Sequence, residues 1–168
     1  MTTDFPAPAF SSEMVIEPAW IDYNGHLNMA YYSLLFDRGS EEIYGDLGLG
    51  AEYAAATGCT TFTGAIQIRY RRELHEGDRV RARLQLLDHD SKRFHFWQEL
   101  YHVDGWLAAT AETLGLHVDR SGPKVAPFPP EVSARLAAMK AAHDRLGWPA
   151  GAGKAIGIGI RRNSAGTG

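Results

Sequence analysis

The sequence predicts a single α+β domain in which one long helix is followed by an antiparallel sheet and then by a second helix. The chain has 168 residues, of which 45% are hydrophobic and 22% charged. This composition is typical of a soluble globular protein, and the length fits one domain with a substantial core. Apolar residues recur with helical spacing over residues 28–47, and four segments of alternating polarity follow, with short turns between them. Short turns require antiparallel pairing, because a parallel partner needs a crossover of about a dozen residues or more.

The predicted domain spans residues 13–147. Residues 1–12 contain two prolines and no periodic pattern, so we expect a flexible leader there. Residues 148–168 contain six glycines, and we expect them to form a flexible tail. The G-x-G pieces of this tail follow no strand and open no helix, which argues against a nucleotide-binding loop.

The first predicted elements are a short strand and the long helix. The strand begins at residues 14–16 and is ended by Pro18 or by the turn residues after it. The helix presents one apolar stripe, and Gly39 and Ser40 lie inside it. These two small residues would let the helix approach a neighbouring layer closely. The stripe consists of Tyr32, Leu35, Phe36, Ile43 and Leu47.

Four further strands complete a predicted sheet of five. Their apolar residues alternate with polar ones, and turn-forming residues separate them. The segments are 62–70, 80–86, 94–101 and 106–118. Pro129 and Pro130 then open the second helix. Its apolar face carries Val132, Leu136, Met139 and Leu146.

Charge and cysteine content exclude several classes of function. The formal net charge is −3, which lacks the strongly basic footprint of a nucleic-acid binder. Cys59 is the single cysteine, so neither an intramolecular disulfide nor a Cys-x-x-Cys site can form, and we expect a buried apolar side chain. We find no secretory leader and no apolar stretch of about 18 residues, so we expect a cytoplasmic protein without a membrane partner.

The sequence also lacks several common catalytic motifs. P-loop, G-x-S-x-G and H-E-x-x-H patterns are absent, which removes the basis for NTPase, serine hydrolase and zinc protease functions. The Asp88-His89-Asp90 run is interpreted as a turn, and no metal or other cofactor is predicted. Two sets of strand residues are expected to be structural: His95, His102 and His117 as satisfied histidines, and Arg69, Arg71, Arg79, Arg81 and Arg83 as a solvated sheet face.

The densest polar cluster runs from residue 22 to residue 28, between the first strand and the long helix. The first N–H groups of a helix have no internal partner, and the helix dipole is positive there. If Asn28 caps the helix, the Met29 N–H is free to stabilise an oxyanion, and Asp22 could attack a bound carbonyl or activate water against it. The alternative is ordinary turn chemistry, for which Asp-x-Asn-Gly is also suited.

Residues 20–37 resemble the D-x-x-G-H-x-N-x-x-x-Y motif of hotdog-fold acyl-CoA thioesterases of the 4-hydroxybenzoyl-CoA thioesterase type. The matching residues are Asp22, Gly25, His26, Asn28 and Tyr32. The resemblance extends over roughly residues 14–132, and it implies a long helix wrapped by a curved five-stranded antiparallel sheet. One departure is Met29, where many relatives have a second Asn.

The resemblance implies hydrolysis of an acyl-CoA thioester without a cofactor. Asp22 would be the nucleophile or general base, and the Met29 N–H would polarise the thioester carbonyl. His26 and Asn28 would position groups around it. Gly25 and Tyr32 would contact the substrate.

Lys92 and Arg93 lie where relatives often contact the nucleotide of CoA. A homodimer, or a dimer of dimers, is implied because relatives pair their sheets edge to edge, with the site at the interface.

Two alternatives remain open. Hotdog hydratases carry a D-x-N-P-x-H signature with Asp and His five residues apart, whereas Asp22 and His26 are four apart and the proline is absent. A hotdog protein that only binds acyl-CoA is the other alternative.

The acyl group is expected to be short. The Asp22–His26 run is similar to the thioesterase segment associated with carnitine breakdown, where betainyl-CoA is the substrate. Aromatic side chains could form a cage for its trimethylammonium group, although they serve equally well in a core. The candidate cage residues are Trp20, Tyr23, Tyr31, Tyr32 and Trp97.

Overall fold

One long helix and four long strands form the framework of residues 4–157, the part of the chain that the computed structural model describes. The strands are β1 (Ala9–Phe10), β2 (Met14–Val15), β3 (Cys59–Tyr70), β4 (Arg79–His89), β5 (Arg93–His102), β6 (Leu107–Asp119) and β7 (Lys124–Val125). The helices are α1 (Met29–Asp46), α2 (Ala51–Thr57) and α3 (Pro130–His143), with short 3-10 turns at Pro18–Trp20 and Asp144–Leu146. The predicted α+β class is confirmed.

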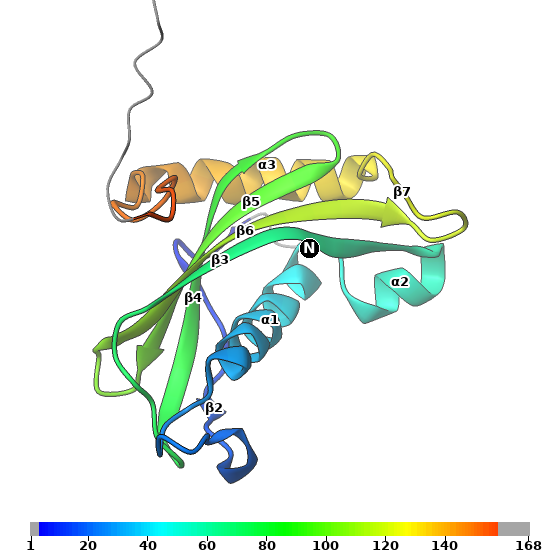
Figure 1. The fold of residues 1–168 in the computed structure, drawn as a ribbon. Helices are drawn as coiled ribbons and strands as arrows, with labels where there is room; N and C mark the ends of the chain where they lie inside the picture. The colour runs from blue at the N-terminus through cyan, green and yellow to red at the C-terminus, as the bar shows by residue number, and fades with distance from the viewer. Residues whose placement is uncertain (1–3, 158–168) are drawn as a thin grey trace, which may run out of the picture.

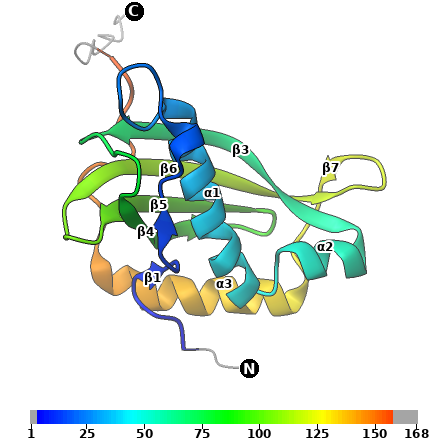
Figure 2. The ribbon, with the colours of Figure 1, turned by 90° about the horizontal axis from the view of Figure 1, so that it is seen from below.

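Within the described residues, the strands form one antiparallel sheet in the order β1-β4-β5-β6-β3. The short strands β2 and β7 pair with β4 and β6, respectively. The long strands curve around α1, as Figure 1 shows, and α3 lies on the β4 side of the molecule (Figure 2). All five predicted strands are present, and the short strands β1 and β7 are additional.

The long helix begins where the sequence predicts. Asn28 is its N-cap, and the Asn28 side chain accepts a hydrogen bond of 3.0 Å from the Ala30 N–H. The predicted apolar stripe is buried, and so are Gly39 and Ser40 within it. A Cβ at Gly39 would lie 2.5 Å from the Cβ of Ala82 on β4. The close approach expected from the two small residues is therefore confirmed.

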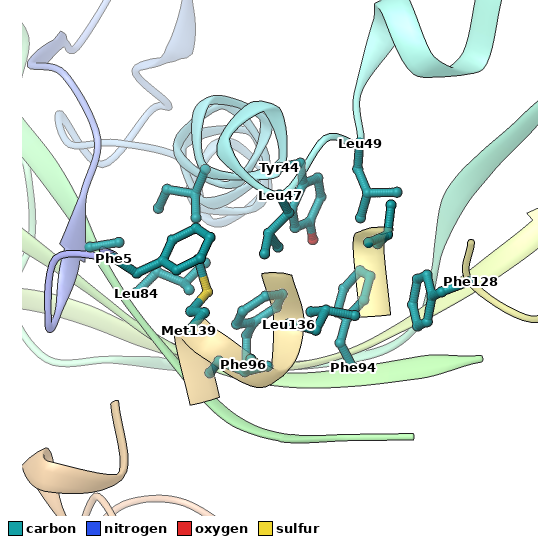
Figure 3. Close-up of a cluster of buried hydrophobic side chains, with 14 residues drawn as sticks. Phe5, Tyr44, Leu47, Leu49, Leu84, Phe94, Phe96, Phe128, Leu136 and Met139 are labelled. Atoms are coloured by element: carbon teal, nitrogen blue, oxygen red, sulfur yellow. The ribbon is translucent and has the colours of Figure 1, made fainter. Parts of the chain in front are cut away.

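A hydrophobic cluster between α1, α3 and the sheet holds the two helices together (Figure 3). Side chains from all three layers meet there, and their burial is the main source of stability for this half of the domain. The residues labelled in Figure 3 include Tyr44 from α1, Leu47 directly after it, Leu84, Phe94 and Phe96 from the sheet, and Leu136 and Met139 from α3.

The leader expected at residues 1–12 is not separate from the domain over the described residues 4–12. Phe5 and Ala9 are buried in the cluster, and β1 pairs with β4. The buried ring of His143 connects the same segment to the core, since its Nδ1 accepts from the Leu86 N–H at 2.8 Å and its Nε2 donates to the Pro6 carbonyl at 2.9 Å. The sequence shows no periodicity here because the contacts of the segment are long-range.

The tail expected to be flexible from residue 148 is docked on the sheet as far as residue 154. Residues 158–168 lie outside the described residues. Arg69 donates to the carbonyls of Gly151 and Lys154, and the Gly153 N–H donates to the Glu112 carboxylate at 2.9 Å. Because these anchors lie on the outer sheet face, Arg69 does not belong to a purely solvated face. We call residues 147–157 the C-terminal strap (orange to red in Figure 1, following α3).

Several smaller expectations also differ from the structure. Helix α2 was not predicted, because seven residues between Gly50 and Gly58 are too few to show a period. Leu146 lies beyond the end of α3 and is exposed. Cys59 is half-buried at the start of β3 rather than fully buried. No group of metal-ligating side chains occurs in the described part of the chain, and none of its helices is long and apolar enough to span a membrane.

Candidate active site

The loop that carries Asp22 is a closed turn. Ile21 and Leu27 form an antiparallel bridge, and the Asp22 N–H donates to the His26 carbonyl at 3.1 Å. The Asp22 Oδ1 accepts a hydrogen bond of 2.8 Å from the Asn24 N–H, and Gly25 supplies the positive φ of 80° that the turn needs. The turn interpretation is therefore correct in geometry, and this turn is also what holds the Asp22 carboxylate in place.

The start of α1 provides a free donor beside this turn. The Asn28 N–H donates to the Trp20 carbonyl at 2.9 Å, and the capping bond occupies the Ala30 N–H. Among the described residues, the Met29 N–H has no acceptor. Since the helix dipole is positive at this end, the Met29 N–H is suited to hold a developing negative charge.

A pocket of about 520 Å³ joins these groups. The predicted site residues that line it are Asp22, His26, Asn28, Met29 and Tyr32; Gly25 shapes the turn without lining the pocket. The structure adds four residues that sequence reasoning missed, from the end of β3 and the segment after it. These are Tyr70, Arg71, Arg72 and Glu73.

Two tyrosines form one wall of the pocket. Tyr32 is buried, and this burial raises the pKa of its hydroxyl. The Tyr70 ring meets the Tyr32 ring edge-on, with centroids 5.0 Å apart, and the Tyr70 hydroxyl lies 3.4 Å from the Met29 carbonyl. His26 also lines the pocket, and its Nδ1 lies 3.5 Å from the Leu27 carbonyl, which is a weak contact.

Lys92 and Arg93 lie away from this pocket in the same chain. They lie at the β4–β5 turn, where Arg93 pairs with Asp90 at 2.6 Å and its hydrogen bond lowers the pKa of that carboxyl. Strand β6 lies between β3 and β5 and relates the two positions. Tyr70 of β3 pairs with Ala109 of β6, and Arg93 of β5 pairs with Leu116 of β6. Seven residues of strand separate these positions, which is about 23 Å at ~3.3 Å per residue.

The aromatic cage is not assembled as the sequence suggested. Trp20 is buried, stacks on Tyr31 with centroids 5.5 Å apart, and carries the Arg38 guanidinium at 5.2 Å. Trp97 is buried next to Gly151 of the C-terminal strap. Of the five candidates, Tyr23 and Tyr32 line the pocket.

The three histidines on strands have structural roles. His95 bonds Glu112 at 2.8 Å, and His102 stacks on Trp106 with centroids 4.6 Å apart. His117 is buried and bonds the Tyr53 hydroxyl at 2.8 Å.

Comparisons with known proteins identify the family of the chain. The family model for the thioesterase-like superfamily matches residues 16–136. The chain is 40% identical over 147 residues to a protein of Pseudomonas aeruginosa named betainyl-CoA thioesterase, covering 87% of this chain and 92% of that protein. It is 35% identical over 155 residues to the L-carnitine dehydrogenase/betainyl-CoA thioesterase of Rhizobium meliloti, which covers 92% of this chain and 31% of that longer protein.

A solved structure resembles the fold throughout. It is a hypothetical protein of Staphylococcus aureus in complex with CoA, 25% identical, with a TM-score of 0.83 over 93% of this chain and 99% of that chain. The predicted hotdog fold and acyl-CoA thioesterase class are confirmed by these comparisons. The chain belongs to the thioesterase-like superfamily.

Proposed function

We propose that the chain hydrolyses a short acyl-CoA thioester with Asp22 as the reacting carboxylate and the Met29 N–H as the oxyanion donor. The observation that carries this proposal is the juxtaposition of the two groups. A carboxylate and a backbone donor without a protein acceptor line one pocket, at a positive helix end. This is the pairing that acyl transfer needs.

Two routes use this geometry. As a nucleophile, the Asp22 carboxylate attacks the thioester carbonyl, CoA leaves as its thiolate, and water then hydrolyses the resulting mixed anhydride. As a general base, Asp22 takes a proton from water, whose oxygen attacks the carbonyl directly, and the C–S bond then breaks to release CoA as its thiolate. In both routes negative charge develops on the carbonyl oxygen, and the Met29 N–H stabilises it.

The acyl group that fits best is betainyl. Its quaternary nitrogen lies one methylene from the carbonyl carbon, so the cation must enter the same pocket as the reacting atoms. The rings of Tyr23, Tyr32 and Tyr70 and the Glu73 carboxylate line that pocket and suit a cation. Two relatives whose names include betainyl-CoA thioesterase support this assignment.

A homodimer would complete the site. Within the described residues β3 pairs only with β6, which leaves its other edge free, and Phe62, Ile66 and Tyr70 on this strand are exposed. Antiparallel pairing of two β3 edges would place the Cys59 end of one strand near the Tyr70 end of the other. Lys92 of the partner subunit and Arg93 of the partner subunit would then approach the Asp22 pocket, which makes their predicted role in binding CoA compatible with the fold.

Release of free thiol from a panel of acyl-CoA substrates tests the function. Loss of crotonyl-CoA absorbance without thiol release would indicate the hydratase, and binding without either change would indicate a non-catalytic protein. Betainyl-CoA is compared with 3,3-dimethylbutyryl-CoA, its uncharged isostere. Cation–π contacts contribute about 0.5–1 kcal/mol at exposed sites and ~2 kcal/mol when desolvated, so we expect betainyl-CoA to be preferred by a few-fold to tens of fold. Equal kcat/KM values for betainyl-CoA and 3,3-dimethylbutyryl-CoA would show that the pocket does not recognise the cation.

A further inference from the structure

Two arginines lie at the rim of the Asp22 pocket without a carboxylate partner. Arg71 and Arg72 line the pocket together with Asp22, and both are exposed. In the described part of the chain, neither guanidinium forms an ion pair or a hydrogen bond. Arg93, by contrast, pairs with Asp90 through its Nε and Nη2.

Backbone hydrogen bonds hold Arg71 and Arg72 at the end of β3. Strand β3 ends at Tyr70, and the N–H groups of Arg71 and Arg72 both donate to the Ala108 carbonyl, at 2.9 and 3.1 Å. This shared acceptor bends the chain away from β6 at the pocket rim. The two side chains therefore start from a rigid point at the end of the sheet rather than from a loose loop.

A stack of side chains also holds one guanidinium. The Arg72 guanidinium lies 4.1 Å from the centre of the Trp106 ring, and Trp106 stacks on His102 with the planes 9° apart. His102 in turn lies 3.7 Å from the Asp78 carboxylate. A planar guanidinium held on a ring face keeps its edge N–H groups free, so it can still bind an anion with little further loss of side-chain freedom.

We propose that Arg71 and Arg72 form an anion subsite that binds phosphate groups of the CoA portion of the substrate. This inference rests on the proposed function and deepens it. Guanidinium groups match the oxygen geometry of phosphate, and their donors here have no competing carboxylate. The arginines also determine how the substrate is oriented in the pocket, because their positive charge repels a trimethylammonium acyl group. The acyl group lies on the tyrosine and Glu73 side, and the CoA chain leaves past the arginines.

The test compares each acyl-CoA with the acyl-pantetheine that carries the same acyl group but no nucleotide. The quantity measured is the preference for CoA, the ratio of the two kcat/KM values. In the Arg71→Ala/Arg72→Ala variant we expect this preference to fall by roughly 10- to 100-fold, since two charge-assisted contacts are lost. The fall should lie in KM, because the contacts are remote from the reacting atoms and are equal in the ground and transition states.

Two controls accompany the variant. Lys140→Ala removes a half-buried cation on α3 that pairs with Asp144 and does not line the pocket, so it should leave the preference unchanged. Arg71→Lys/Arg72→Lys keeps the charge and should restore part of the preference. A folding defect lowers kcat/KM for both substrates alike and does not change their ratio. If the double alanine variant fails to fold, Arg71→Gln and Arg72→Gln are measured singly.

An unchanged CoA preference in the Arg71/Arg72 variants would overturn the inference. A preference lost only in Lys92→Ala/Arg93→Ala would also overturn it, by placing the phosphates at the β4–β5 turn. Titration calorimetry with CoA, the product, separates this outcome from a failure of the proposed function. Weaker CoA binding in the arginine variant, with no thiol release by the wild type, would leave the anion subsite standing and reject the hydrolase.

Discussion

Substituting Gly39 with alanine should destabilise the protein because α1 touches the sheet at this residue. The new Cβ would lie 2.5 Å from the Ala82 Cβ, whereas carbon atoms in contact are about 3.5–4.0 Å apart. The helix must therefore move away by about 1 Å, and overpacking of this kind costs roughly 1–3 kcal/mol. Alanine also favours the helix by about 1 kcal/mol over glycine, which partly offsets the cost.

Gly45 in the same helix provides the matched control. A Cβ at Gly45 would meet no atom within 4 Å outside the backbone of its own helix, so Gly45→Ala adds helix propensity without a clash. Both variants replace a glycine of α1 with alanine, so most of the gain in helix propensity cancels when their free energies of unfolding are compared. Urea unfolding should then place Gly39→Ala roughly 1–3 kcal/mol below Gly45→Ala. Equal stability of the two variants would refute the close approach of α1 to the sheet.

Three further predictions concern the core, the strap and the assembly. Burial lowers the pKa of His143, so the folded protein binds a proton on this ring less readily than the unfolded chain does, and the free energy of unfolding should fall as the pH drops below about 6.5. Urea unfolding at several pH values should show that this free energy depends less on pH in His143→Gln than in the wild type. An equal pH dependence in the two proteins would contradict the neutral buried ring. Gly151→Ala would put a Cβ 2.5 Å from the Trp97 ring, so limited proteolysis should cut the strap faster than in the wild type, and equal rates would argue against its docking. Light scattering should give at least twice the 18.5 kDa mass of one chain, whereas an active monomer would reject the interface-built site.

Local chemistry made most of the fold predictable. Capping by Asn28 and the turn before it depend on residues next to each other in sequence, and the structure confirms both. The long strands were predicted from alternation, which the burial pattern keeps only in the first half of β4 and in the middle of β6. Segments held by distant partners could not be predicted in this way. Arg69 and Gly151 are 82 residues apart, and β1 forms only because β4 offers a free edge.

Of the residues that line the pocket, the sequence predicted those of the motif but not those from the end of β3. The residues of the motif lie together because one turn and one helix end position them, whereas Tyr70 and Arg72 reach the pocket through the curvature of the sheet. The alternation of side chains along β5 could also have predicted which aromatic residues face away from the core. Phe94 and Phe96 face the core, so Trp97, one residue further along β5, must face the outer side.

Asp22→Asn tests the central claim most directly. The amide keeps an oxygen that can accept the Asn24 N–H bond, so the turn should persist and the free energy of unfolding should change little. It removes both nucleophilicity and basicity, and we expect kcat for thiol release from the best acyl-CoA substrate to fall by about 10²–10⁴ with KM nearly constant. A variant that keeps kcat within a few-fold of the wild type would contradict the role of Asp22 as the reacting carboxylate.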